Sequence, residues 1–348
     1  MDIFEMKRYD VPTGVIFTAK TERGDIEFLS VGDYGKERNI KADFLGISRE
    51  LNGVEDGGVL PLSEKWVITI STQHGCSMGC RFCDVPFVGA GKNITKEGLD
   101  FQIETAIQHH QDVKQTKRLN IHYARMGEPT FNRVVLSHAK TLRDTVCKYI
   151  AADTVHPVVS TMMPKKNKKL ESFLQEWAAI KNDVYNGEAG LQLSINSTDD
   201  YQREWMFGES SLPLADISSI AQNLPNPKGR KYALNFALSD DSIVDAQKLA
   251  EMFSPDNFMV KITPIHKTAE AKANRIRTSK GYENYSPYIA AESALKDAGF
   301  DVLVFVPSKE EESGLITCGN AVLSGSWPKK RISCGSLILV KDCLPVSC

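Results

Sequence analysis

The chain has 348 residues, and its 42 lysines and arginines against 44 aspartates and glutamates give a formal net charge of −2. Hydrophobic residues make up 42% and charged residues 25%, which is typical of globular proteins and excludes a disordered chain, a collagen and a coiled coil. No apolar run approaches the roughly 18 residues that a membrane-spanning helix needs, and the N-terminus lacks a cationic region followed by an apolar one. We therefore expect a cytoplasmic protein with no membrane segment.

The first 60 residues differ in pattern from the rest of the chain. Short strands are expected at Gly14–Lys20, Ile26–Val31 and Asn39–Leu45, with turns at the Gly-Asp pairs that begin at Gly24 and Gly32. From Trp66 onward, β-branched runs alternate with amphipathic helical segments, which predicts βα units wound into a parallel sheet or barrel. The expected strands are 66–71, 119–124, 155–161, 191–196, 231–238, 259–264 and 301–307, and the expected helices are 95–110, 133–150, 168–181, 243–252 and 285–298.

These patterns divide the chain into three parts. We expect a β-rich N-terminal extension over residues 1–64, a partial or full (β/α) barrel over 65–322, and a C-terminal tail over 323–348. The alternation of strands and helices is lost in the tail, where Leu337–Val340 is the one candidate strand. The fold class is α/β with a small β-rich lead-in.

Cysteines are the unusual feature of this sequence. Cys76, Cys80 and Cys83 follow the first barrel strand with the spacing C-x3-C-x2-C. Three thiolates in one loop can hold three irons of a [4Fe–4S] cube and leave the fourth iron open. A structural zinc site needs four ligands, and His74 is the nearest fourth candidate, although its spacing is poor. The pattern favours the cluster over zinc and over three incidental cysteines.

Five motifs in order carry a resemblance to a known family. They are ISTQHGCSMGCRFCDVPFVGAGKNIT (70–95), RMGEPTFN (125–132), VVSTMMP (158–164), LQLSINS (191–197) and LITCGNAV (315–322). Together they resemble the RlmN/Cfr family of radical S-adenosylmethionine (SAM) methyltransferases, which act on adenine in ribosomal and transfer RNA. The resemblance implies a radical SAM barrel, one [4Fe–4S] cluster, SAM, an RNA substrate and an electron donor such as flavodoxin or ferredoxin.

The resemblance also assigns SAM-binding residues at the ends of successive strands. Gly127 and Glu128 are expected to accept the SAM amine, although Gly-Glu-Pro also suits an ordinary turn. Contacts to the SAM ribose and carboxylate are implied for Ser160, Ser194, Ile195 and Asn196. A lone serine or asparagine at a strand end is more commonly a helix cap. His266 stands at the adenine-side position, where the family usually has asparagine.

Two further residues are implied to take part in catalysis. Cys318 matches the family cysteine that accepts a methyl group from one SAM, and whose S-methyl then loses hydrogen to a deoxyadenosyl radical and adds to the adenine ring. A buried structural cysteine is the alternative. Asp56 aligns by spacing with the family's acid/base carboxylate, next to Glu55, although an acidic loop is commonly just solvated surface.

The sequence departs from the family in two ways. Thr69 stands where the family has a cysteine that resolves the covalent intermediate, and a hydroxyl cannot do thiolate chemistry. Cys334, Cys343 and Cys348 are candidates for that step. The helical accessory domain that precedes the family's β lead-in is also not expected here.

Three functions therefore remain open. The first is methylation of an adenine ring carbon of RNA. The second keeps the radical chemistry but acts on a free nucleotide, DNA or a peptide, and the third is a non-catalytic iron–sulfur or zinc module. Lys261–Lys280, with six lysines and arginines against one glutamate, is a candidate phosphate-binding strip, and the lysines of 165–169 are another.

Overall fold

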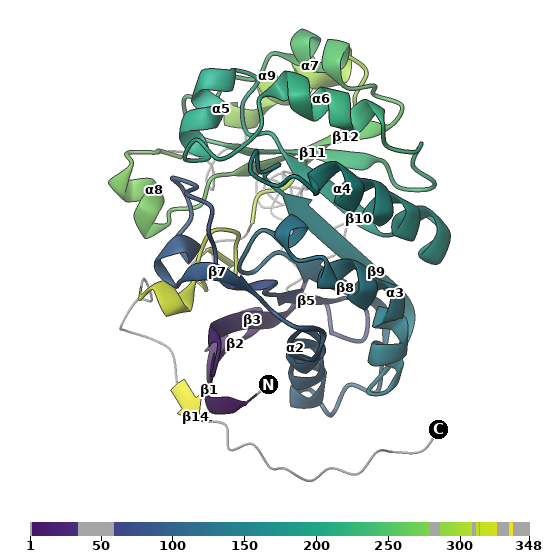
Figure 1. The fold of residues 1–348 in the computed structure, drawn as a ribbon, viewed down its shortest axis with the longest axis vertical. Coiled ribbons are helices and arrows are strands. Elements are labelled where there is room, and N and C mark those ends of the chain that lie inside the picture. The colour runs from purple at the N-terminus through teal and green to yellow at the C-terminus, as the bar shows by residue number, and fades with distance from the viewer. Residues whose placement is uncertain are drawn as a thin grey trace, which may run out of the picture.

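The computed structural model describes residues 2–33, 59–278, 286–307, 311–312, 314–325 and 334–336. Most strands among these residues form one curved sheet with helices along its outer face (Figure 1). The strand order is β13-β12-β11-β10-β9-β8-β5-β3-β2-β1-β14, and every pairing from β5 to β13 is parallel. Within the described residues the sheet stays open, so the expected barrel is a partial one.

The parallel strands and helices follow the predicted alternation. The strands are β5 (Trp66–Ile70), β8 (Gln115–Tyr123), β9 (Ala151–Thr161), β10 (Gly190–Ser194), β11 (Tyr232–Leu238), β12 (Phe258–Pro264) and β13 (Val302–Val304). The helices are α2 (Lys96–His109), α3 (Val134–Cys147), α4 (Leu170–Ala179), α5 (Asp200–Met206), α6 (Leu214–Gln222), α7 (Ala246–Met252), α8 (Ala269–Ala273) and α9 (Ser286–Asp297). Of these helices, α5, α6 and α8 were not predicted.

The N-terminal lead-in extends the same sheet. It consists of β1 (Ile3–Val11), β2 (Gly14–Thr21) and β3 (Gly24–Gly32), and β3 pairs antiparallel with β5. The predicted turn at Gly24-Asp25 is wrong, because the chain turns two residues earlier, where the Thr21 hydroxyl accepts from Arg23 N and donates to Gly24 O. Asn39–Leu45 and Leu337–Val340 lie outside the described residues. The tail contributes β14 (Cys334–Ser336), which pairs with β1, and the three-part division stays a prediction.

The two faces of the parallel sheet differ in chemistry. One face packs against the helices, and its large side chains are fully buried: the Tyr123 hydroxyl lies 2.6 Å from His138 Nδ1 on α3, and Trp177 Nε1 of α4 donates to Gly190 O at 3.0 Å. Each such side chain stabilises the fold by about 1.5–3 kcal/mol through burial. Because side chains alternate along a strand, the intervening residues point to the opposite, concave face.

No helix in the described part of the chain is both long and apolar enough to cross a membrane.

Candidate active site at the carboxyl edge of the sheet

The three-cysteine loop lies at the carboxyl edge of the parallel strands. It follows β5 and the short strand β6 (Gln73–Gly75), which pairs with β7 (Ala90–Asn93). Thr72 N donates to Met126 O at 2.9 Å, so the start of the loop is held against the end of β8. Gly75 has a φ of +77°, and a Cβ there would lie 2.2 Å from Gly89 O, so only glycine fits directly before Cys76.

The three thiols lie close enough to influence one another. Burial raises the pKa of Cys76 to about 11. The N–H groups of Met78 and Gly127 oppose this rise, because they favour the thiolate. Burial, and then the neighbouring thiols, raise the pKa of Cys80 and of Cys83 well above the ordinary range. Three partly buried thiols this close together are unfavourable as thiolates, and bound cations would supply the compensating positive charge.

This donor set fits an iron–sulfur cube better than a single metal ion. Among the described residues, no three histidine, cysteine or acidic side chains are grouped so that they could hold one metal ion. A [4Fe–4S] cube takes its thiolates on separate irons at separate corners, so its ligands stand further apart than those of tetrahedral zinc. Three cysteines without a fourth ligand would also leave one iron open.

Gly127 and Glu128 lie against the cysteine loop. Gly127 has a φ of +94°, and a Cβ there would meet the Gln73 side chain at 2.5 Å. The Glu128 carboxylate accepts hydrogen bonds from Thr130 N at 3.1 Å, from the Thr130 hydroxyl at 2.7 Å and from Met162 N at 3.0 Å. Burial raises its pKa, which these bonds oppose. Glu128 thus joins the ends of β8 and β9, and its carboxylate keeps few lone pairs for a ligand.

The predicted residues on the next strands are brought together at the same edge. Ser160 pairs in register with Gln192, and Ser194 with Asn235. Asn196 is buried, and its Oδ1 accepts from Ala237 N at 2.9 Å, so this side chain fixes the ends of β10 and β11. Ile195 is fully buried, and its N–H bonds Asn235 O.

A buried arginine that the sequence analysis missed supports these strand ends. Arg203 on α5 donates to Ser194 O at 2.7 Å and to Ile195 O, and its guanidinium lies 4.8 Å from the centre of the Phe207 ring. Burial lowers its pKa to about 9. Arg203 gave no sequence signal, because a single arginine on a short helix is normally exposed.

A buried ion pair holds the loop that carries Cys318. Glu27 on β3 accepts from Arg125 Nε at 2.9 Å, from Val322 N at 3.1 Å and from Leu323 N at 3.0 Å. Arg125 Nη2 donates to Leu315 O at 3.0 Å. These hydrogen bonds hold the loop before Cys318, at Leu315, and after it, at Val322 and Leu323. We call Glu27 and Arg125 the clamp. The sequence analysis missed both residues.

Cys318 lies beside the cysteine loop. Asp84 N, next to Cys83, donates to Gly319 O at 2.8 Å. Solvent reaches the Cys318 side chain. The protein packed around it nevertheless raises the pKa of its thiol, while Lys261 and Arg125 lower that pKa. His266 lies near the same loop, with Nδ1 2.8 Å from Glu312 Oε2. Both nearby cations favour a Cys318 thiolate.

Most residues proposed from the sequence for acid/base chemistry and for resolving the intermediate lie outside the described structure, whereas Thr69 lies within it. Asp56 and Glu55 lie outside the described residues, as do Cys343 and Cys348, and only the backbone of Cys334 is described. Thr69 pairs in register with Leu29 on one side and with His122 on the other. It therefore points to the concave face, on the same side as the clamp residue Glu27.

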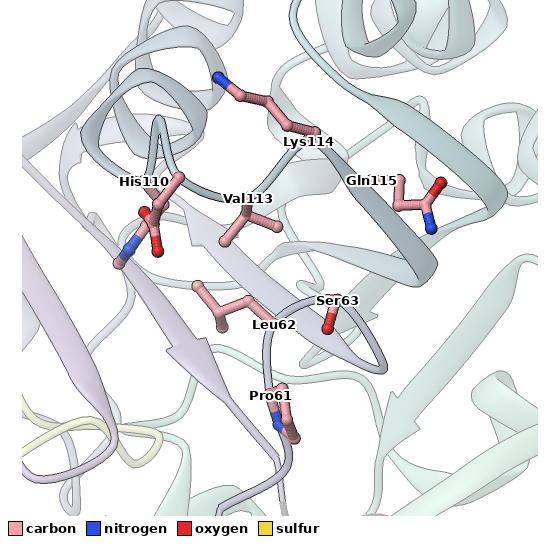
Figure 2. A pocket seen from close by; sticks show the side chains of 8 residues that line it. Pro61, Leu62, Ser63, His110, Val113, Lys114 and Gln115 are labelled. Atoms are coloured by element: carbon pink, nitrogen blue, oxygen red, sulfur yellow. The ribbon is translucent and has the colours of Figure 1, made fainter.

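A cavity of about 590 Å³ lies away from this edge (Figure 2). Leu62 and Val113 face one another across it, and Ser63 and Gln115 lie near the amino ends of β5 and β8. Ligands of parallel α/β sheets bind at the carboxyl ends of the strands, and none of the predicted site residues lines this cavity.

A close backbone contact between the cysteine loop and the turn after α5 gives a first prediction. Gly208 has a φ of +57°, and a Cβ there would lie 2.1 Å from Gly79 O. We expect Gly208→Ala to lower the free energy of unfolding by at least about 1–3 kcal/mol, measured by thermal denaturation, and to displace the cysteine loop. Gly325→Ala is the control, since its φ of +81° carries a similar backbone cost in open space. Equal losses in both variants would contradict a steric role.

The fold and the site define a class: an α/β protein whose partial barrel of parallel strands carries a three-cysteine loop at the carboxyl edge of its sheet. The chain matches a radical SAM methyltransferase of known structure from Sphaerobacter thermophilus with a TM-score of 0.59 at 18% identity, covering 88% of this chain and 77% of that one. This likeness shows the fold, and the predicted fold class is confirmed. No protein-family model matches the chain.

The similarity in sequence is to RlmN proteins, so the predicted resemblance is confirmed. The chain is 25% identical over 270 residues to the dual-specificity RNA methyltransferase RlmN of Sorangium cellulosum, which covers 76% of this chain and 64% of the relative. It is 26% identical over 248 residues to that of Campylobacter lari, covering 70% and 65%. The chain thus spans less than two thirds of the length of these relatives.

Proposed function

We propose that this protein is a radical SAM methyltransferase that methylates an adenine ring carbon of RNA, with Cys318 as the methyl carrier. One observation carries the proposal: the Cys318 loop lies directly against the three-cysteine loop, joined by the bond from Asp84 N to Gly319 O at 2.8 Å. The two loops are far apart in sequence, and an incidental cysteine has no need of this placement. The RNA methyltransferase names of the relatives agree with it.

The proposal gives each residue of the carboxyl edge a role. Cys76, Cys80 and Cys83 would hold one [4Fe–4S] cluster. A reduced cluster bound there would supply the one electron that cleaves SAM to methionine and a 5′-deoxyadenosyl radical. The remaining SAM contacts are assigned to Gly127, Glu128, Ser160, Ser194, Ile195, Asn196 and His266. The electron donor would be a flavodoxin or ferredoxin of the cytoplasm.

The chain's own groups prepare Cys318 for methyl transfer. A thiolate, not a thiol, attacks the sulfonium methyl group. Burial raises the pKa of Cys318 overall, and the nearby Lys261 and Arg125 oppose that rise by favouring the thiolate. The clamp bonds Leu315 on one side of it and Val322 on the other, which restricts where the sulfur lies. Asp56 remains the proposed acid/base residue.

Thr69 favours a second candidate, in which the same radical chemistry acts on a free nucleotide, DNA or a peptide. In the described residues the Thr69 hydroxyl has no hydrogen-bond partner, and it faces the same side of the sheet as Glu27. We expect Thr69→Cys to change the rate of product release in multiple-turnover assays, because a thiol can cleave a methylene–sulfur adduct and a hydroxyl cannot. An unchanged rate would mean that release does not pass through this position.

The methyltransferase proposal is tested first on the protein alone. Anaerobic reconstitution with iron and sulfide is expected to give a brown protein that cleaves SAM to 5′-deoxyadenosine with a reductant. Mass spectrometry of tryptic peptides is then expected to show one added methyl group on the Cys318 peptide and none on the Cys147 peptide, since Cys147 lies exposed on α3. A colourless, zinc-loaded protein would refute both candidates.

The substrate is tested in cells. Nucleoside mass spectrometry of RNA with and without the gene is expected to show loss of one methylated adenine. If every RNA methyladenine persists while Cys318 is still methylated in the protein, the second candidate takes the place of the first.

A further inference from the structure

A group of polar side chains on the concave face of the sheet has no partner within the described structure. His122, Ser160, Gln192, Ser194 and Asn235 come from the adjoining strands β8 to β11, and all are partly accessible. No hydrogen bond joins any of these five side chains to another described residue. Their sequence neighbours Tyr123, Leu191, Leu193, Leu234 and Phe236 are buried on the opposite, helix-covered face. Polar groups aimed at an interior face without protein partners are typical of a ligand site.

The sheet curves so that this face encloses a common space with Cys318. Three strands separate β8 from β12 in the sheet order. Burial is the main cause that lowers the pKa of His122, on β8, to about 3, and the positive charge of Lys261, on β12, is the second cause. Lys261 also lowers the pKa of Cys318. The loop that carries Cys318 also bonds both of these strand ends: its Leu315 O accepts from Arg125, just after β8, and its Glu312 pairs with His266, just after β12. His122, Lys261 and Cys318 therefore border one interior region.

Strand register then fixes which side chains are neighbours. Asn235 lies beside Ser194 on β10 and beside Lys261 on β12, while Gln192 lies beside Ser160 on β9. Gln192 and Asn235 are diagonal neighbours on β10 and β11, since Gln192 is paired with Ala233, and such positions are about 7–8 Å apart. Long side chains can reach one flat ring across that distance.

Each side-chain amide presents a donor next to an acceptor. Adenine carries the complementary pair, an amino group beside a ring nitrogen, which is why asparagine and glutamine are its common partners in base recognition. We propose that Gln192 and Asn235 recognise the hydrogen-bonding edge of an adenine base that enters the concave face beside Cys318. His122 is then a third contact to the ring. This inference rests on the proposed function and adds to it the residues that select the base.

Adenine could reach this face from RNA or from the adenosine of SAM, and the experiment separates the two. The probe is a fluorescent uridine oligoribonucleotide with one central adenosine, compared with the same oligonucleotide carrying inosine, which lacks the amino group. Binding to the reconstituted protein is measured by anisotropy under anaerobic conditions. Cleavage of SAM without RNA is measured in parallel.

The variants are Gln192→Glu and Asn235→Asp, which keep size and remove the donor. We expect the wild-type protein to prefer adenosine by about tenfold, which is within the range for one good base contact. Both variants should lose most of that preference and keep SAM cleavage. Gln111→Glu, an exposed residue before β8, makes the same chemical change and is expected to keep the preference. Circular dichroism checks that each variant is folded. Asn235→Ser is a second, smaller substitution at the same position, used in case Asn235→Asp does not fold.

Three results would overturn the inference. If either variant discriminates adenosine as well as the wild type does, that residue does not recognise the base. If preference and SAM cleavage fall together in a folded variant, the amides serve the adenosine of SAM. If the wild-type protein binds neither oligonucleotide, the RNA substrate of the proposed function is refuted as well. That result differs from the first one, in which RNA still binds but the substituted residue does not select the base.

Discussion

Glu27→Gln is expected to lower the free energy of unfolding by about 3–5 kcal/mol, the range for breaking a buried ion pair. Glu27 is fully buried and Arg125 is 5% exposed, so the substitution leaves the arginine charge without its partner in the protein interior. The carboxylate also accepts from the N–H groups of Val322 and Leu323, and a glutamine has only one acceptor oxygen. Urea unfolding of the purified protein measures the loss.

The same variant is expected to loosen the Cys318 loop. Hydrogen exchange should increase over residues 315–323, and methylation of Cys318 should slow more than SAM cleavage does. Glu64→Gln is the control, because its ion pair with Lys117 is exposed and such pairs contribute at most about 1 kcal/mol. If Glu27→Gln is no more destabilising than Glu64→Gln, the clamp does not hold this loop.

Cys80→Ser is expected to abolish iron binding and with it the cleavage of SAM. A serine hydroxyl does not ionise at neutral pH and is a poor ligand for iron, and the two remaining thiols can hold only two corners of a cube. Iron content and the visible absorbance of the reconstituted protein measure the effect, with thermal unfolding of the iron-free forms as a check on the fold.

Cys147→Ser provides the comparison for this experiment. Cys147 is exposed at the end of α3, so its replacement should leave iron content and SAM cleavage at wild-type values. A full complement of iron in Cys80→Ser would show that Cys80 is not a ligand, and the assignment of the three-cysteine loop would have to be abandoned.

Sequence alone located the parallel strands well because they are buried on the helix-covered side and rich in β-branched residues. Trp66–Ile70 differs from its predicted span by one residue, and Thr95, the predicted start of the first helix, caps α2 by accepting from Gly98 N. Strand β1 was missed because Ile3–Val11 includes Glu5, Lys7, Arg8 and Asp10, so its alternation is weak. Helix α5 was missed because it has only seven residues, too few for a helical period to be recognised.

The candidate site was predictable to the extent that it consists of local motifs. The cysteine spacing and the Gly-Glu-Pro motif identified two loops that the structure places in contact, with Gly127 N–H directed at Cys76. The clamp was not predictable in this way. Glu27 and Arg125 are a single acidic and a single basic residue 98 positions apart. They meet only because β5 pairs with β3 on one side and with β8, which precedes Arg125, on the other.

The hairpin of β2 and β3 has a consequence for how this protein tolerates insertions and deletions. Glu27 and Leu29 share one face of β3, and Leu29 is paired with Thr69. Side chains on a strand alternate, so an odd-length insertion between Glu27 and Leu29 would turn Glu27 toward α2 and away from Val322, 295 residues later in the chain. An even-length insertion would preserve the direction. Glu22 and Arg23 form the hairpin turn, outside the paired residues, so an insertion there does not reverse the direction of Glu27. Within β3, whether an insertion has an odd or an even number of residues decides whether Glu27 still reaches Val322 and so holds the loop that carries Cys318.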